Sequence, residues 1–196
     1  MRPLLPAALL TLVASCSVGP TPTPTAVVVA APGAPFAEQL AAREVVRYVW
    51  LRTGALLPIV ASLDAVPAGA AALCIGALAG DTGTLATEAV LLRTSRRDGH
   101  AILQISGGSP RATLYAAYRF AEHLGVRFGL HGDVIPSQRV PFVLPALDEL
   151  REPLFARRGI QPFHDFPEGP DWWDRDDYLA VLSQLPKLGM NLNVRL

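Results

Sequence analysis

This chain of 196 residues has few cysteines and a formal net charge of zero, and each of these two features argues against a class of protein. The only cysteines are Cys16 and Cys74, and no cluster of cysteine and histidine has the spacing of a zinc site. We therefore expect no metal ion and no cofactor. Lysine plus arginine equals aspartate plus glutamate, at 17 each, and no basic stripe alternates with aromatic residues. Nucleic acid is not an expected partner, because its phosphates require clustered positive charge.

Motifs for phosphate binding and for a nucleophilic serine are also missing. The loop GALAGDTG has glycines at positions 76, 80 and 83, which is not the spacing of GxGxxG. The stretch GGSPR around Ser109 is not a GxSxG turn, and Ser109 is better explained as a helix N-cap. Cys74 lies in the apolar run AALCIGA, so we expect it to be a small buried side chain and not a nucleophile.

The first residues are typical of an export signal. MRPLLPAALLTLVASC has one arginine and then an apolar run of roughly a dozen residues, which is too short to span a bilayer. Its end resembles the bacterial lipoprotein signal, in which the cysteine is lipidated and becomes the mature N-terminus. We predict a signal over residues 1–16, lipidation at Cys16 and an exported protein, periplasmic or at the cell surface, that meets the membrane only through this anchor. An ordinary cleaved signal peptide and a buried helix are the alternatives.

The pattern after a stiff Pro/Thr linker at 17–25 predicts an α+β domain over residues 26–150. The run AVVVAA predicts a strand, and the apolar spacing that follows predicts a helix ending at Gly54. Pro58 in LLPIVAS predicts an edge strand, and VLLRTSRRDGHAILQIS predicts a β-hairpin that turns at 97–99. Two helices packed on a mainly antiparallel or mixed sheet accommodate these elements.

The clearest helix lies in GGSPRATLYAAYRFAEHLGVRF. Ser109 is a natural N-cap, Pro110 suits the first helical position and Gly125 stands where a C-cap glycine belongs. After this helix, VRFGL predicts a strand, and HGDVIPSQRVPFVLPALDELREP predicts an irregular crossing to a domain boundary near residue 150.

The last segment, residues 151–196, predicts one β/α unit. RRGIQPF predicts a strand, HDFPEGPDWWDRD a loop, and RDDYLAVLSQLPKLGMN a helix with Asp174 as N-cap and a break at Pro186. LNVRL predicts the next strand. A (β/α)8 barrel typically takes about 250 residues, so we expect this segment to be the start of a truncated barrel.

The stretch ISGGSPRATLYAAYRFAEHLGVRF resembles the end of the small α+β domain that precedes the catalytic barrel in β-N-acetylhexosaminidases and α-glucuronidases. RRGIQPFHDF resembles their first barrel strand, and DYLAVLSQLPKLGMNLNVRL resembles the helix and strand that follow. The resemblance covers about residues 25–196. It implies an exo-acting glycoside hydrolase of carbohydrate metabolism. Arg158 matches a strand-one arginine that holds sugar hydroxyls in hexosaminidases, whereas QPFHD departs from the usual pattern around Asp165.

The loop after the first barrel strand is where a barrel enzyme contacts its substrate. We therefore predict carbohydrate contact for His164, Asp165, Trp172 and Trp173 in this loop, and the resemblance implies the same contact for Arg158. No catalytic residue is assigned, because the carboxylate pair that the resemblance implies lies later in a barrel, and we expect this chain itself to be inactive. The alternatives are a solvated acidic loop with packed tryptophans, a non-catalytic cell-surface module that binds glycan or protein, and an unrelated esterase-like barrel.

Overall fold

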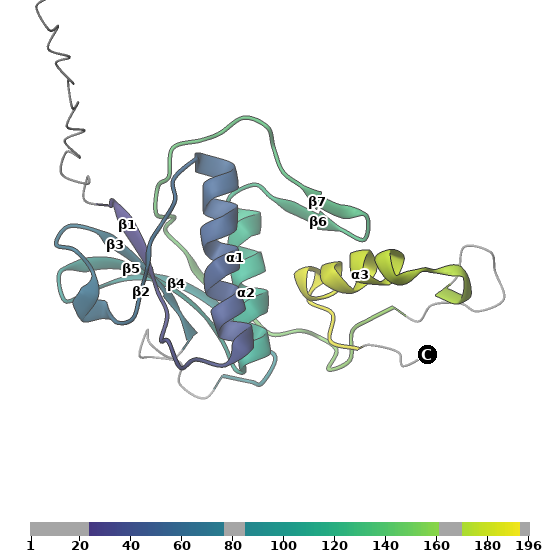
Figure 1. Ribbon diagram of the computed structural model, residues 1–196. Helices are drawn as coiled ribbons and strands as arrows, with labels where there is room; N and C mark the ends of the chain where they lie inside the picture. The colour runs from purple at the N-terminus through teal and green to yellow at the C-terminus, as the bar shows by residue number, and fades with distance from the viewer. Residues whose placement is uncertain (1–23, 77–84, 161–169, 193–196) are drawn as a thin grey trace, which may run out of the picture.

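A computed structural model describes residues 24–76, 85–160 and 170–192 of the chain (Figure 1). The predicted signal segment with its lipidation site Cys16, and nearly all of the linker, lie outside the described residues. The elements in chain order are β1 (Ala26–Val29), α1 (Phe36–Thr53), β2 (Ile59–Val60), η1 (Leu63–Ala65), β3 (Ala71–Ile75), β4 (Val90–Arg97), β5 (His100–Gly107), α2 (Pro110–His123), β6 (Arg127–Gly129), β7 (Gly132–Val134), β8 (Asp148–Arg151), η3 (Pro170–Trp172), α3 (Arg175–Gln184) and η4 (Pro186–Leu188).

The fold is α+β, with a six-stranded mixed sheet in the order β2-β1-β3-β5-β4-β8. Pro58 precedes a short strand at the edge of this sheet, as predicted. The sheet is mixed, which is one of the two predicted arrangements: β1–β2, β1–β3 and β3–β5 are parallel, whereas β4–β5 and β4–β8 are antiparallel. Every residue of β1 is buried, and such a strand, apolar on both faces, is typical of parallel pairing.

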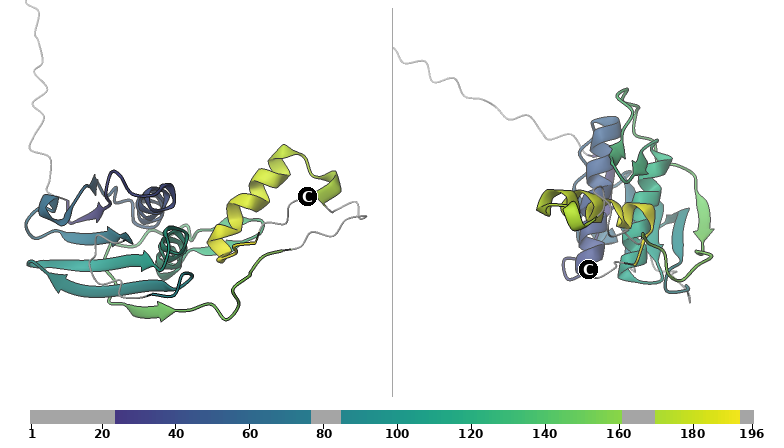
Figure 2. Two further views of the ribbon diagram at one scale, coloured as in Figure 1. Left: turned by 90° about the horizontal axis from the view of Figure 1, so that it is seen from below. Right: turned by 90° about the vertical axis from the view of Figure 1, so that its right-hand side faces the viewer.

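Helices α1 and α2 lie side by side on one face of the sheet (Figure 2). The core lies between these two helices and the sheet, and its largest side chains are Tyr48, Leu73, Leu92, Leu103, Ile105 and Phe120. A smaller apolar cluster on the opposite face contains Cys74, which is a free and fully buried thiol as predicted. Phe36, the first residue of α1, is in contrast 73% exposed and lies outside this core.

The predicted local signals at helix ends and at the hairpin are confirmed. The Oγ of Ser109 accepts a hydrogen bond from the backbone N–H of Ala112 at 3.2 Å, so it caps α2. The β4–β5 hairpin turns at Asp98 and Gly99, whose φ angles are 50° and 83°. Positive φ at both central positions is the requirement of a tight primed turn, which explains the Asp-Gly sequence.

The crossing after α2 is more regular than predicted. Residues of β6 and β7 form a separate two-stranded hairpin, and β8 joins the main sheet beside β4. The buried Arg52 fixes the crossing, because its guanidinium donates to the carbonyl oxygens of Leu124 at 2.8 Å, Pro136 at 2.8 Å and Gln138 at 2.7 Å. Because β8 pairs with β4, the sheet extends to Arg151, close to the predicted domain boundary near residue 150.

The last segment contains α3, which projects beyond the two sheet-covering helices (Figure 1). Asp174 caps this helix in a reciprocal capping box with Asp177, and the helix ends before Pro186, as predicted. Gly159 and Leu192 form an isolated parallel bridge. A Cβ at Gly159 would lie 2.6 Å from the carbonyl oxygen of Leu192, so this close approach requires glycine. Among the described residues, no helix is long and apolar enough to cross a membrane.

Candidate functional site

The predicted carbohydrate-binding residues are only partly within the described residues. His164 and Asp165 lie outside them. Trp172 is 71% exposed, whereas Trp173 packs edge-to-face on Tyr178 with ring centroids 5.3 Å apart. Arg158 lies against the α+β domain, where it is engaged with several protein groups. Because His164 and Asp165 lie outside the described residues, the shared carbohydrate site stays a prediction.

Three nitrogen atoms of the Arg158 guanidinium each have a protein acceptor. Nε donates to the carbonyl oxygen of Gly189 and Nη1 to that of Phe155, both at 2.8 Å. Nη2 donates to the carboxylate of Glu88 at 2.8 Å, which makes an ion pair between the last segment and the α+β domain. The guanidinium also lies 6.0 Å from the ring centroid of Tyr115.

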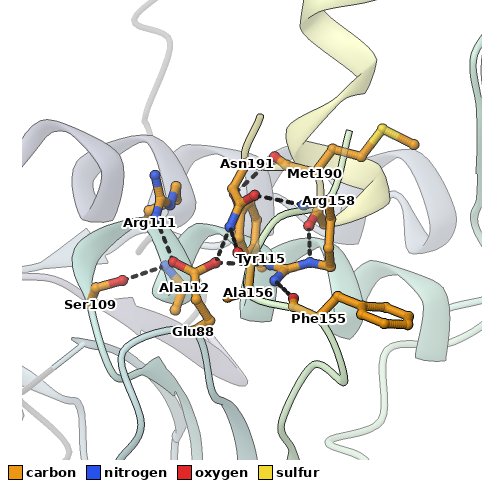
Figure 3. Close-up of polar contacts among 11 residues, drawn as sticks. Glu88, Ser109, Arg111, Ala112, Tyr115, Phe155, Ala156, Arg158, Met190 and Asn191 are labelled. Carbon is orange, nitrogen blue, oxygen red and sulfur yellow. Dashed lines mark hydrogen bonds and ion pairs between the residues drawn. The ribbon is translucent and has the colours of Figure 1, made fainter. Parts of the chain in front are cut away.

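The Glu88 carboxylate is the centre of a polar cluster that joins the two parts of the chain (Figure 3). Its Oε1 accepts a hydrogen bond from Arg111 at 2.5 Å, and its Oε2 accepts from Arg158 at 2.8 Å and from the Asn191 amide at 3.0 Å. Partial burial would raise the pKa of this carboxyl, but the three donors outweigh it and hold the pKa below its ordinary value. We call Glu88, Arg111, Tyr115, Arg158 and Asn191 the Glu88 cluster.

Backbone contacts complete the docking of the last segment at this cluster. The hydroxyl of Tyr115 donates to the carbonyl oxygen of Met190 at 2.9 Å. The side-chain oxygen of Asn191 accepts a hydrogen bond from the backbone N–H of Arg158 at 2.9 Å. The backbone N–H of Asn191 donates to the backbone carbonyl oxygen of Arg158 at 2.8 Å. Figure 3 shows these groups converging from α2 and from both ends of the last segment.

A second ion pair holds η4 against the β6–β7 hairpin. Lys187 donates to Asp133 at 2.7 Å, and the side chain of each is only 9% exposed. The hydroxyl of Tyr48 donates to the other oxygen of Asp133 at 2.7 Å, and Arg47 lies 3.6 Å from the same oxygen. Burial would raise the pKa of the Asp133 carboxyl, but these donors and charges, with Lys187 the strongest, lower it.

Two open grooves border these contacts. The first, about 400 Å³, lies between α2, β8 and η4, and its charged lining includes Arg119, Glu122, Arg151, Glu152, Arg158 and Lys187. The second, about 470 Å³, is mainly apolar and lies between α2 and α3, with Leu114, Leu182, Leu185 and Met190 in its lining. Within this lining Arg119 pairs with Glu122 and Arg158 with Glu88, whereas Lys187 pairs with Asp133, which does not line the groove.

The carboxylates of this region suit binding more than proton transfer. Glu149 accepts hydrogen bonds from Arg119 at 2.8 Å and from His123 at 2.7 Å, and it also pairs with Arg151. Its pKa, like that of Glu88, would be raised by partial burial but is held below the ordinary value by these partners. A carboxyl group that stays ionised near neutral pH is a poor general acid. Among the described residues, no three metal-ligating side chains gather into a metal site.

The residues that join the two parts were missed at the level of sequence. Glu88 is 70 residues from Arg158 and 103 residues from Asn191 along the chain, and no local spacing reveals such partners. Lys187 and Asp133 are likewise 54 residues apart. The capping and hydrophobic patterns that predicted the helices carry no information on these long-range pairs. Neither the protein-family models nor the curated proteins give a match to this chain.

Proposed function

We propose that the chain is the N-terminal part of an exported, exo-acting glycoside hydrolase similar to hexosaminidases or α-glucuronidases. In this proposal residues 26–150 form an accessory α+β domain, and residues 151–196 begin the catalytic (β/α)8 barrel. One observation carries the proposal: Gly159 and Leu192, on either side of α3, form a parallel bridge directly after the α+β sheet ends. Strand, helix and parallel strand make up the repeating unit of such a barrel.

The surface of α3 supports the same reading. Leu179 is 51% exposed and Leu182 is 39% exposed, although both side chains are large and apolar. In a (β/α)8 barrel the apolar side of each outer helix packs on neighbouring helices and strands. Further β/α units would give these leucines a partner, and such units would also supply the catalytic carboxylates.

Carbohydrate contact is proposed for the loop that follows the first barrel strand. Trp172 offers an exposed aromatic face, which suits stacking on the C–H surface of a sugar ring. His164, Asp165 and Trp173 belong to the same proposed surface by their place in the sequence. Catalysis is assigned to no residue of this chain, and the 196-residue chain is expected to be inactive by itself.

A non-catalytic cell-surface module that binds glycan or protein is the second candidate. The α+β domain favours it, because this domain has its own buried core between two helices and six strands and needs no barrel to be stable. The two candidates differ in whether bond cleavage accompanies binding.

The test is a comparison of hydrolysis and binding. The protein encoded by the complete reading frame is assayed on nitrophenyl N-acetylhexosaminides and glucuronides, and the 196-residue chain is titrated with the corresponding free sugars by NMR. Trp50, a partly exposed tryptophan of α1, serves as the control. A rate of hydrolysis that falls at least tenfold in Trp172→Ala but not in Trp50→Ala supports carbohydrate contact by the proposed loop. Binding without hydrolysis supports the module instead. Neither binding nor hydrolysis refutes both.

A further inference from the structure

The last segment has almost no core of its own. Among the described residues of 152–160 and 171–192, only Gln184 and Leu185 are buried. Strand register is normally fixed by a hydrophobic pattern that must face a core, and a strand pair without such a core is prone to slip. The pairing of Gly159 with Leu192 therefore needs another determinant.

One carboxylate of the α+β domain contacts the residues that precede both members of the Gly159–Leu192 bridge. The Oε2 atom of Glu88 accepts a hydrogen bond from Arg158, which precedes Gly159, and another from Asn191, which precedes Leu192. Arg158 and Asn191 also bond each other through backbone and side chain. Both donors reach the same oxygen atom only when these two residues lie side by side.

We propose that Glu88 is a positioning residue that fixes the register of the parallel pair formed around Gly159 and Leu192. A slip of one residue would place Met190 or Leu192 beside Arg158 in the position of Asn191. Neither of these side chains can donate a hydrogen bond, so the carboxylate would lose a donor. Arg111 holds Glu88 from the α2 side, which keeps the carboxylate in place independently of the last segment.

The same contacts assign Arg158 a docking role at this interface. A guanidinium has five N–H groups, and the three nitrogen atoms of Arg158 are already bonded to Glu88, Phe155 and Gly189. Its side chain is 21% exposed, and its ring neighbour Tyr115 belongs to α2. This role concerns how the two parts of the chain dock, so it holds whether or not the protein is a hydrolase.

The test uses Glu88→Gln in the whole chain, with amide hydrogen exchange and NOE contacts measured by NMR. The amides of Asn191 and Leu192, which donate to the carbonyl oxygen of Arg158, should exchange about tenfold faster, as expected for losing hydrogen bonds to a charged group. NOE contacts between Gly159 and Leu192 should weaken, whereas the amides of β3 and β5 should keep their protection.

The matched control is Glu149→Gln. The Glu149 side chain is 17% exposed, close to the 14% of Glu88, and it also pairs with cationic side chains, but these all belong to α2 and β8. This variant should leave the Asn191 and Leu192 amides unchanged. Equal acceleration in the two variants would overturn the proposal, because it would show a general loosening and not a register effect.

A second variant keeps the proposal falsifiable if Glu88→Gln unfolds the domain. Asn191→Ala removes one of the two donors that the last segment presents to Glu88. Asn191 lies outside the α+β core, so the domain should stay folded. It should accelerate exchange at Leu192 to a similar extent, and combining it with Glu88→Gln where that variant is folded should add little. Unchanged exchange at Leu192 in Asn191→Ala refutes the register role of this cluster.

Discussion

Replacing Lys187 with methionine should release η4 from the β6–β7 hairpin. Methionine keeps most of the aliphatic length of lysine but removes the ammonium group that pairs with Asp133 at 2.7 Å. Both side chains of this pair are only 9% exposed, so the carboxylate would be left partly buried beside an apolar group. The substitution therefore tests the electrostatic part of docking with little change in volume.

The expected cost follows from the remaining partners of Asp133. Removing one member of a buried ion pair typically costs about 3–5 kcal/mol. Asp133 keeps the hydrogen bond from Tyr48 at 2.7 Å and the more distant Arg47 at 3.6 Å, so the lower end of that range, about 3 kcal/mol, is expected. The carboxylate regains water when η4 detaches, and the loss should therefore appear as local opening and not as global unfolding.

Native-state hydrogen exchange at the amides of Leu188, Gly189 and Met190 measures this opening, because all three are hydrogen-bonded within η4 and its ends. A loss of about 3 kcal/mol accelerates their exchange by roughly 100-fold. Lys187→Arg keeps the charge and should recover most of the protection.

Two outcomes would refute this reasoning. Acceleration of less than about threefold in Lys187→Met would mean that apolar packing alone holds η4. Equal loss in Lys187→Arg would mean that the shape of the lysine matters and not its charge.

Three further predictions concern the carboxylates and the sheet. The pKa values of Glu88 and Asp133 are lower in the folded chain than in the unfolded one. The stability that these carboxylates contribute to the fold is therefore complete above about pH 5 and is lost as the pH falls through their folded pKa values. The melting temperature should fall over this acidic range and remain constant above it. Gly108→Ala should destabilise the chain by more than about 2 kcal/mol in urea unfolding, because a Cβ would press on the carbonyl oxygen of Ala86. Burial raises the pKa of the Cys74 thiol to about 11, so Ellman's reagent should modify this thiol only after unfolding.

Local chemistry was predictable from the sequence. The cap at Ser109, the turn at Asp98 and Gly99, and the end of α3 before Pro186 all depend on residues within a few positions of each other. The buried state of Cys74 followed from its apolar neighbours. Such signals do not need to know which strands become neighbours.

Strand pairing and the docking contacts were not predictable in the same way. The four residues of β1 are all apolar, which is typical of a parallel strand buried on both faces but does not say which strands become its neighbours. The short strands β7 and β8 are rich in charged residues and glycine, which conceals them in a sequence pattern, whereas β6 lies within the predicted strand VRFGL. Sugar contact was predicted for Arg158 because it matches the strand-one arginine of hexosaminidases, and only its spatial neighbour Glu88 suggests another role.

The buried Arg52 implies an order of events during folding. Its three carbonyl partners follow it by 72, 84 and 86 residues, so these bonds require the end of α2 and the crossing after it to fold back on α1. Contacts of such large sequence separation are closed late, because the loop-closure entropy must be overcome first. The proline-rich crossing should therefore be the slowest part of the α+β domain to become ordered, with β8 adding to the sheet after it. On a ribosome, this places completion of the sheet after synthesis of nearly the whole domain.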